Sequence, residues 1–383
     1  MSNRSVQDAD VQEARDLLTD YFESEDPIRF RFEKIIGVGA YGIAWRLKYK
    51  PSTPSGGSGK SRRVVMKMDR SHATSGLGEQ GGDEGDESRP TISHESHYLS
   101  ILKWAKHVVN LIEPPNDPLK QQIPDIPPHG IKEGEWMYLE WLENGTLSSF
   151  LDRAIEANRQ LPNRMMWRFF LCLTRMGIAM AWPPDGPGDD GGPQLETIGQ
   201  RRARRMVHDD LHDENVMFGD FDEEDGEHDL TPVMKAIDFG LAKIYGDHPR
   251  YRGMGMLDNI FSFGILMSEI ATLDRSNAGI GEPTHEDADL YAEGREEEIL
   301  IAATVLIPDE EPNTSIDPDL RYLIASCTQI RKEDRPSLQD LERQITEAIE
   351  TRDEQWYVSR NMNARGESDE NIDDIIQELI LDA

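Results

Sequence analysis

The stretch Val207–Val216, VHDDLHDENV, places four acidic residues and two histidines within ten positions. Carboxylates and imidazoles at this density can orient a hydroxyl group, accept its proton or bind a metal ion. His208 and His212 also have the spacing of the zinc motif HExxH, which needs a helix to bring both rings to one face. Here Asp209 replaces the glutamate, and the flanking residues have the pattern of a strand end and a turn. We therefore do not favour zinc at this stretch.

A glycine-rich segment, IIGVGAYGIAW, occupies residues 35–45 and contains the pattern GxGxxG at Gly37, Gly39 and Gly42. A dinucleotide-binding fold would require a helix after these glycines. Apolar residues instead recur at every second position over residues 43–49, which predicts a half-buried strand. A strand, a glycine turn and a strand form the context of a loop that covers nucleotide phosphates with its backbone N–H groups. An ordinary glycine-rich hairpin is the alternative for this segment alone.

Further motifs follow in a characteristic order. They are VVMK at Val64–Lys67, a helix bearing Glu95, YLEWLENGTL, the stretch VHDDLHDENV, AIDFGLAK at Ala236–Lys243, NIFSFGILMSEI at Asn259–Ile270 and RKEDRPSL at Arg331–Leu338. In this order they resemble the eukaryotic protein kinase family over about residues 28–350. The resemblance implies an α+β, two-lobed fold. The small N-terminal lobe, residues 28–140, would be β-rich with one key helix, and the larger C-terminal lobe, residues 141–350, would be mostly helical.

The resemblance also implies ATP and Mg²⁺ as cofactors and transfer of the γ-phosphate to a protein hydroxyl, on Ser or Thr rather than Tyr. Lys67 would hold the α- and β-phosphates, and Glu95 would pair with it. Asp210 would be the catalytic aspartate that orients the acceptor hydroxyl. Asn215 and Asp238 would be the magnesium ligands, since this cation prefers oxygen donors.

The remaining expectations concern the nucleotide pocket and the apolar spine that joins the lobes. The implied nucleotide-binding residues are Gly37, Gly39, Gly42, Ala44, Val65, Lys67, Glu140, Leu142 and Met217. Leu139 would be the gatekeeper, with Trp141 in the hinge that meets the adenine. His208 and Phe239 would belong to the spine. The usual valine after the glycine loop is Ala44 and the usual alanine before the strand lysine is Val65, so we expect a reshaped adenine pocket.

The catalytic loop departs from the family at two positions. Asp209 stands where an arginine usually pairs with a phosphorylated activation segment, so switching by that route is not expected. His212 stands where Ser/Thr kinases usually have a lysine. The pattern HxDLHxxN is instead similar to that of small-molecule kinases of the aminoglycoside and choline type. We expect His208 to be architectural, and Asp213 and Glu214 to belong to a solvated turn.

The activation segment departs as well. It is short, and no Ala-Pro-Glu follows Asp238. That tripeptide normally closes the peptide-binding platform, so Arg335 is expected to lack its usual partner. Asn259 replaces an aspartate at the start of a long buried helix, beside Asp258. An asparagine still accepts backbone N–H bonds, but without the assistance of a charge.

Composition excludes some classes of partner. The 383 residues carry a net charge of −32, which argues against nucleic-acid and anionic-membrane binding. Two cysteines are too few for a disulfide framework, and Cys172 is expected to be a buried structural thiol. No signal peptide or membrane span is apparent, so we expect a soluble, cytoplasmic protein. The basic run RRARR at 201–205 leaves a nuclear location open, although a solvated segment is the preferred interpretation.

The flanks and insertions are polar. Residues 1–27 are expected to be an N-terminal extension, and residues 351–383 a polar tail with a short amphipathic helix, IDDIIQELIL. The acidic segments 71–90 and 220–229 could attract a basic protein substrate, but solvated insertions are the preferred interpretation. The leading hypothesis is an active protein kinase. A catalytically weak or inactive ATP-binding interaction module and a small-molecule kinase remain as alternatives, and the sequence indicates no oligomeric state.

Overall fold

The computed structural model shows an α+β protein whose chain divides into two compact units. Unit 1 comprises Met1–Ile101 and Val109–Trp141, and unit 2 comprises Leu102–Val108 and Leu142–Ala383. The structure describes residues 11–12, 15–16, 18–19, 22–23, 28–38, 42–51, 60–69, 91–115, 117–120, 135–246, 248, 254–276, 289–291, 298–307 and 311–382. Gly39 and the acidic segment 71–90 lie outside these residues. Within them, no helix has the length and apolar character needed to cross a membrane.

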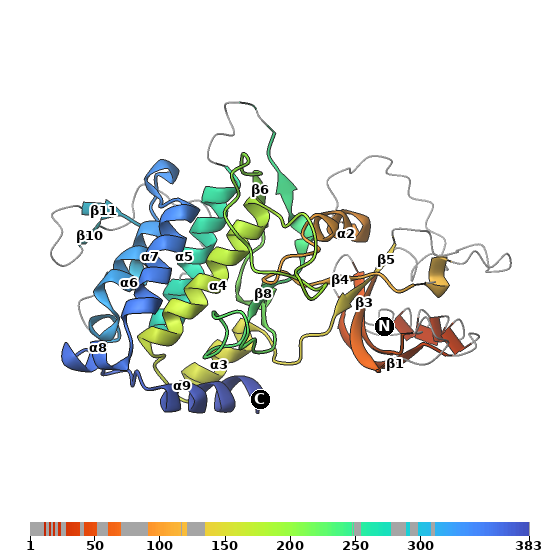
Figure 1. Ribbon diagram of the computed structural model, residues 1–383, viewed down its shortest axis with the longest axis horizontal. Coiled ribbons are helices and arrows are strands. Elements are labelled where there is room, and N and C mark those ends of the chain that lie inside the picture. The colour runs from red at the N-terminus through yellow and green to blue at the C-terminus, as the bar shows by residue number, and fades with distance from the viewer. Residues whose placement is uncertain are drawn as a thin grey trace, which may run out of the picture. The chain divides into compact units, whose positions relative to one another are not determined.

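Unit 1 is built on a five-stranded sheet in the order β1-β2-β3-β5-β4, with every neighbouring pair antiparallel (Figure 1). Its elements are β1 Phe30–Val38, β2 Gly42–Tyr49, β3 Arg62–Asp69, α2 Ile92–Ile101, β4 Leu111–Ile112 and β5 Trp136–Glu140. The strand expected after the glycines is confirmed as β2. Its alternate residues Ile43, Trp45, Leu47 and Tyr49 are buried while Lys48 is exposed, which is the period of a half-buried strand.

Aromatic rings form the core of unit 1. Phe30 stacks on Tyr49 with ring centroids 4.7 Å apart and on Tyr138 at 5.1 Å. Phe22, from the segment expected to be an N-terminal extension, stacks on Phe30 at 5.1 Å and is buried. Offset and stacked aromatic pairs of this kind contribute about 0.5–1.5 kcal/mol beyond their buried area. The described part of the N-terminal segment is therefore packed into the core of unit 1.

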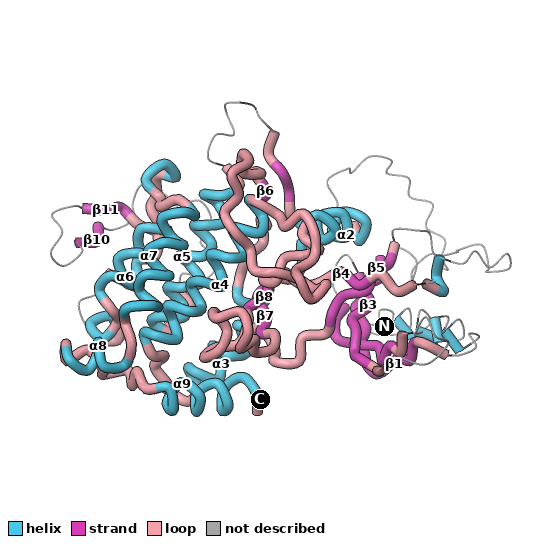
Figure 2. The backbone as a smooth tube through the Cα atoms, viewed as in Figure 1, coloured by secondary structure: helices cyan, strands magenta, loops and turns pink. Residues whose placement is uncertain are grey.

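Unit 2 is mostly helical, as the cyan segments of Figure 2 show. Its helices are α3 Leu147–Glu156, α4 Asn163–Ala181, α5 Met256–Thr272, α6 Pro318–Cys327, α7 Leu338–Thr351, α8 Glu354–Ser359 and α9 Asp369–Ile376. Three short strand pairs accompany them: β6 Met206–Val207 with β9 Lys243–Ile244, β7 Val216–Phe218 with β8 Met234–Ala236, and β10 Asp289–Tyr291 with β11 Glu298–Leu300.

Helix α4 is the centre of unit 2, because all of its residues except Arg164 and Arg168 are buried. It packs against α5 and α7 (Figure 1). Gly177 permits this approach. A Cβ atom there would lie 2.8 Å from the Phe263 ring of α5 and 2.9 Å from a Leu338 methyl of α7.

The C-terminal segment packs against the rest of unit 2 and provides hydrogen-bond acceptors for the first turn of α4. The N-cap position of α4 is Pro162, which has no side-chain hydrogen bond to offer the first turn. The Glu367 carboxylate supplies the missing acceptor. It accepts hydrogen bonds from the Asn163 and Arg164 backbone N–H groups, both at 3.0 Å. Apolar residues of the expected amphipathic helix, including Ile375 of α9, are buried. Two N–H groups in the first turn of α4, which have no acceptor within the helix, thus depend on a carboxylate about 200 residues away in sequence.

We expect Glu367→Ala to lower the free energy of unfolding by about 1–3 kcal/mol, because it leaves two helix N–H groups without acceptors. Urea unfolding followed by circular dichroism measures the change. Glu370→Ala, which removes an exposed carboxylate at the start of α9, is the matched control and should change stability by less than about 0.5 kcal/mol. Equal effects of the two substitutions would contradict the capping role of Glu367.

Candidate functional site

In unit 1 the structure brings Lys67 and Glu95 together. The Lys67 Nζ atom on β3 lies 2.7 Å from Glu95 Oε1 in the first turn of α2. The Glu95 side chain is 5% exposed and that of Lys67 is 21% exposed, so the carboxylate is enclosed while the ammonium keeps access to solvent. A buried carboxylate needs a charged partner, and the pair fixes the position of the ammonium. Lys67 is thereby held as a cation that can still contact an anionic ligand.

The face of the sheet that carries Lys67 is the one opposite the aromatic core. Ala44 pairs with Lys67 in the β2–β3 register, and Val65 pairs with Arg46, which puts these side chains on one half-buried face. Gly42 is required by close packing, since a Cβ atom there would lie 2.8 Å from the Met68 carbonyl oxygen. A Cβ atom at Gly37 would meet no heavy atom within 4 Å, so packing among the described residues does not explain that glycine.

The residues expected at the hinge lie at the end of unit 1 and the start of unit 2. The Glu140 carboxylate accepts hydrogen bonds from the Asn110 backbone and side-chain nitrogens, at 2.8 and 2.9 Å. Leu142 is buried, and the expected gatekeeper Leu139 is buried in β5. The expected adenine contact Met217 lies on β7 and is half-buried. Both hydrogen bonds end on Oε1 of the Glu140 carboxylate.

In unit 2 a short hairpin brings Asn215 and Asp238 to the same end. Val216 opposes Ala236 in the antiparallel β7–β8 pair, and the Ile237 N–H donates to the Asn215 carbonyl at 2.9 Å. Asp238 follows with φ 60° and ψ 73°, in the left-handed region that aspartate tolerates better than most residues. Its Oδ1 accepts a hydrogen bond from the Gly240 N–H at 3.3 Å. Two hard oxygen donors therefore sit at one hairpin end.

Asp210 is hydrogen-bonded to Asn215. The Asn215 Nδ2 atom donates to the Asp210 carbonyl oxygen at 2.8 Å and lies 3.3 Å from Asp210 Oδ2. This commits the amide nitrogen and leaves Oδ1 as the acceptor of the Asn215 side chain. The Asp210 side chain is 43% exposed, so a substrate can reach its carboxylate. His212 Nε2 lies 3.1 Å from Asn215 Nδ2 and 3.8 Å from Asp210 Oδ1, so the unusual histidine contacts both side chains.

Buried hydrogen bonds of His208 and Asn259 fix the start of the loop that carries Asp210. His208 is fully buried; its N–H donates to Asn259 Oδ1 at 3.1 Å, and its Nε2 lies 2.9 Å from the Ile237 carbonyl oxygen. Because a carbonyl only accepts, His208 carries a proton on Nε2, and burial lowers its pKa so that the ring stays neutral. Its ring lies 4.6 Å from that of Phe239. Asn259 therefore accepts a backbone N–H bond, as we expected.

Asp209 forms an ion pair that does not involve Asp210. It has φ 65°, and its Oδ2 lies 2.6 Å from Lys243 Nζ. Lys243 belongs to β9, which pairs with β6 immediately before the catalytic loop, and Val207 is its partner in that register. The charge of Asp209 is thus offset by a lysine of the activation segment, in a half-exposed ion pair.

The expectation about Asp213 needs correction. Asp213 is not part of a solvated turn: its carboxylate is buried and is bonded to the Arg275 guanidinium. Of these two acidic residues only Glu214 is exposed, as expected. The Arg335 Nε atom donates to the Gln329 carbonyl and its Nη1 atom to the Leu257 carbonyl, both at 2.8 Å.

Glu269 is a further buried carboxyl close to the site; it lies within the motif NIFSFGILMSEI, which gave it no role. It lies on α5 and is 3% exposed. Burial raises its pKa to about 7, the charge of Asp213 acts in the same direction, and Arg275 opposes the shift. The folded state therefore binds this proton more tightly than the unfolded state over the interval between the ordinary glutamate pKa and about 7.

We expect the contribution of buried Glu269 to the free energy of unfolding to fall as pH rises from about 4.5 to about 7. Glu269→Gln should remove this contribution and be more stable than wild type at pH 8, by up to about 3 kcal/mol. Below pH 4.5 the two proteins should be equally stable. Urea unfolding at a series of pH values measures the difference, and a constant difference across the series would contradict the raised pKa.

No protein-family model matches this chain, and neither does any curated protein. The assignment of the site therefore depends on the arrangement of its own side chains. The structure brings Lys67 to Glu95 in unit 1, and Asp210, Asn215 and Asp238 to one loop and hairpin in unit 2.

Proposed function

We propose that this protein is an ATP-dependent phosphotransferase that uses Mg²⁺ and transfers the γ-phosphate of ATP to a protein hydroxyl, on Ser or Thr rather than Tyr. The observation that supports it most is the hairpin end that carries Asn215 and Asp238, with Asp210 bonded to Asn215. An amide oxygen and a carboxylate suit magnesium, which takes only a few protein ligands and keeps water and phosphate oxygens in its octahedron.

Each residue has a distinct task in the proposed reaction. Lys67, fixed by Glu95, neutralises phosphate oxygens as a point charge. Asn215 and Asp238 are the candidate ligands of Mg²⁺, which supplies charge neutralisation at the phosphates when bound. Asp210 accepts a hydrogen bond from the acceptor hydroxyl and takes its proton as the new O–P bond forms and the bond to the β-phosphate oxygen breaks. Catalysis is then mostly positioning and electrostatic stabilisation.

The Asp209–Lys243 pair bears on how such activity would be controlled. An arginine before the catalytic aspartate would attract a phosphate on the activation segment. Here the residue is an anion that already binds a lysine of that segment at 2.6 Å. A phosphate would find repulsion at Asp209, so we propose that the segment is held in place without phosphorylation.

A small-molecule acceptor is the second candidate, and it is favoured by His212. Its imidazole lies beside Asp210 and Asn215, at the position where a lysine would be expected for a protein substrate. The missing Ala-Pro-Glu points in the same direction, because that tripeptide closes a peptide platform. An interaction module that binds nucleotide without turnover remains the non-enzymatic alternative.

We expect Asp210→Asn to lower phosphate transfer from Mg-ATP by about 10²–10⁴-fold, the usual contribution of a general base. The assay measures transfer to Ser/Thr, Tyr and basic peptides and to aminoglycoside- and choline-like alcohols. Glu214→Gln, which changes an exposed carboxylate of the same loop, is the matched control and should retain the rate. Equal rates for Asp210→Asn and wild type would contradict catalysis at this site. Transfer to the small alcohols alone would favour the second candidate.

Nucleotide binding can be tested without knowing the acceptor. We expect Lys67→Met to weaken Mg-ATP binding by roughly tenfold or more, because a hydrogen bond to a charged group contributes about 1.5–3 kcal/mol. Asn215→Ala should abolish the enhancement of ATP binding by Mg²⁺ while leaving metal-free binding in place. Isothermal titration calorimetry measures both. Lys48→Met, which changes an exposed residue near the end of β2 opposite Gly42, is the control that should bind as wild type does. Unchanged affinity in Lys67→Met would argue against the proposed role of Lys67.

A further inference from the structure

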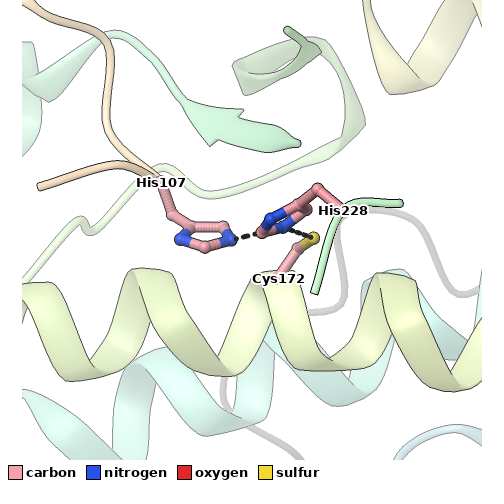
Figure 3. A group of neighbouring side chains, drawn as sticks. All are labelled: His107, Cys172 and His228. Carbon is pink, nitrogen blue, oxygen red and sulfur yellow. Dashed lines mark hydrogen bonds between the residues drawn. The ribbon is translucent and has the colours of Figure 1, made fainter. Parts of the chain in front are cut away.

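Three potential metal-binding side chains meet in the interior of unit 2, away from the residues assigned to catalysis. His107 comes from the segment Leu102–Val108, Cys172 from the middle of α4, and His228 from the loop between β7 and β8 (Figure 3). Their exposed fractions are 0%, 1% and 1%. Their donor atoms all lie within 4.8 Å of one another. The cluster joins three segments that are far apart in sequence.

Hydrogen bonds fix which nitrogen of each ring faces the others. His107 Nδ1 lies 2.7 Å from Glu196 Oε2, and His228 Nδ1 lies 2.6 Å from Asp225 Oδ2. An ionised carboxylate only accepts hydrogen bonds, so each Nδ1 carries a proton. A neutral ring protonated at Nδ1 presents a bare lone pair at Nε2. The two Nε2 atoms therefore turn their lone pairs inward.

The inward atoms are too close to be left without a positive charge between them. The two Nε2 atoms lie 3.1 Å apart, and Cys172 Sγ lies 3.4 Å from His228 Nε2 (Figure 3). Opposed lone pairs at this distance repel unless a proton or a cation joins them. Tetrahedral zinc with ordinary Zn–N and Zn–S bonds would place two nitrogens roughly 3.3 Å apart, and a nitrogen and a sulfur roughly 3.6 Å apart. The two observed separations are within a few tenths of an ångström of these values.

We propose that His107, Cys172 and His228 form a structural site for a borderline-soft divalent cation, Zn²⁺, with two imidazole nitrogens and one thiolate as protein ligands. Glu196 and Asp225 hold the two rings in the ligating tautomer, as carboxylates behind zinc-bound histidines do. Lys106 lies 2.9 Å from Asp225 Oδ2 and 2.6 Å from Asp222 Oδ2, and so offsets part of the carboxylate charge. Zinc accepts this donor set readily, whereas Mg²⁺ and Ca²⁺ prefer oxygen.

The position of the cluster suggests what the metal would stabilise. The Ala236 N–H on β8 donates to the His107 carbonyl at 2.9 Å, and Val108 forms a parallel bridge with Ala236. His228 lies in the loop that closes the β7–β8 hairpin. A metal at the cluster would fasten this hairpin to α4 through Cys172. The opposite end of the same hairpin carries Asn215 and Asp238.

The test uses the full chain and needs no assay of activity. Metal is removed with a chelator, and Co²⁺ is added as a spectroscopic substitute for Zn²⁺. We expect one equivalent of Co²⁺ to bind with visible bands of tetrahedral cobalt and a thiolate-to-cobalt charge-transfer band. Cys172→Ser should lose the charge-transfer band. Cys327→Ser, which changes the other buried cysteine, is the matched control and should keep it.

X-ray absorption of the zinc-loaded wild-type protein makes the test independent of whether a variant folds. The proposal predicts one sulfur and at least two imidazole nitrogens around the metal. It also predicts that Zn²⁺ raises the Tm of wild type and of Cys327→Ser. Failure of the folded wild type to retain an equivalent of Zn²⁺ or Co²⁺ after dialysis would overturn it, and would indicate a proton between the two rings. A zinc shell without sulfur, or an unchanged charge-transfer band in Cys172→Ser, would overturn it as well.

Discussion

The backbone of Ile237 holds the candidate catalytic residues of unit 2 in one place. Its N–H donates to the Asn215 carbonyl at 2.9 Å, and its carbonyl lies 2.9 Å from His208 Nε2. One residue therefore joins both ends of the catalytic loop to the position just before Asp238. Because His208 is buried and neutral, this arrangement requires no charge in the interior. These two bonds fix the backbone on both sides of the hairpin end that carries Asn215 and Asp238.

The residues that depart from the protein kinase pattern make different kinds of contact in the structure. Asp209 and Lys243 form an ion pair of the kind that a phosphate and an arginine would otherwise form, with the charges exchanged. Arg335 has backbone carbonyl partners, so the region where Ala-Pro-Glu is missing still satisfies that guanidinium. His212 is the change that contacts the Asp210 and Asn215 side chains themselves.

Local patterns in the sequence predicted local structure and single contacts well. The alternation after the glycines is strand β2, Lys67 meets Glu95 as the resemblance implied, and Asn259 accepts a backbone N–H. Such features depend on periodicity or on motifs with a fixed spacing. The nucleotide and metal roles of these residues remain predictions.

Contacts between distant segments could not be predicted in the same way. Asp213 is buried because Arg275, 62 residues later, reaches it, and a turn rich in charge gives no sign of that partner. Glu367 caps α4 from 204 residues away. The carboxyl of Glu269 is buried by the packing of α5, and the sequence motif on this helix did not predict that burial. Cys172 was expected to be a buried thiol, but nothing in its own segment indicated two histidines beside it.

The most direct measurement of the central claim is a crystal structure of the full chain with a non-hydrolysable ATP analogue and Mn²⁺ in place of Mg²⁺. Anomalous scattering would locate the metal without reference to any acceptor. We expect manganese to bind between the analogue's phosphates, Asn215 Oδ1 and the Asp238 carboxylate, with the Lys67 ammonium on a phosphate oxygen. An analogue and manganese bound elsewhere, or no binding at saturating nucleotide, would contradict it.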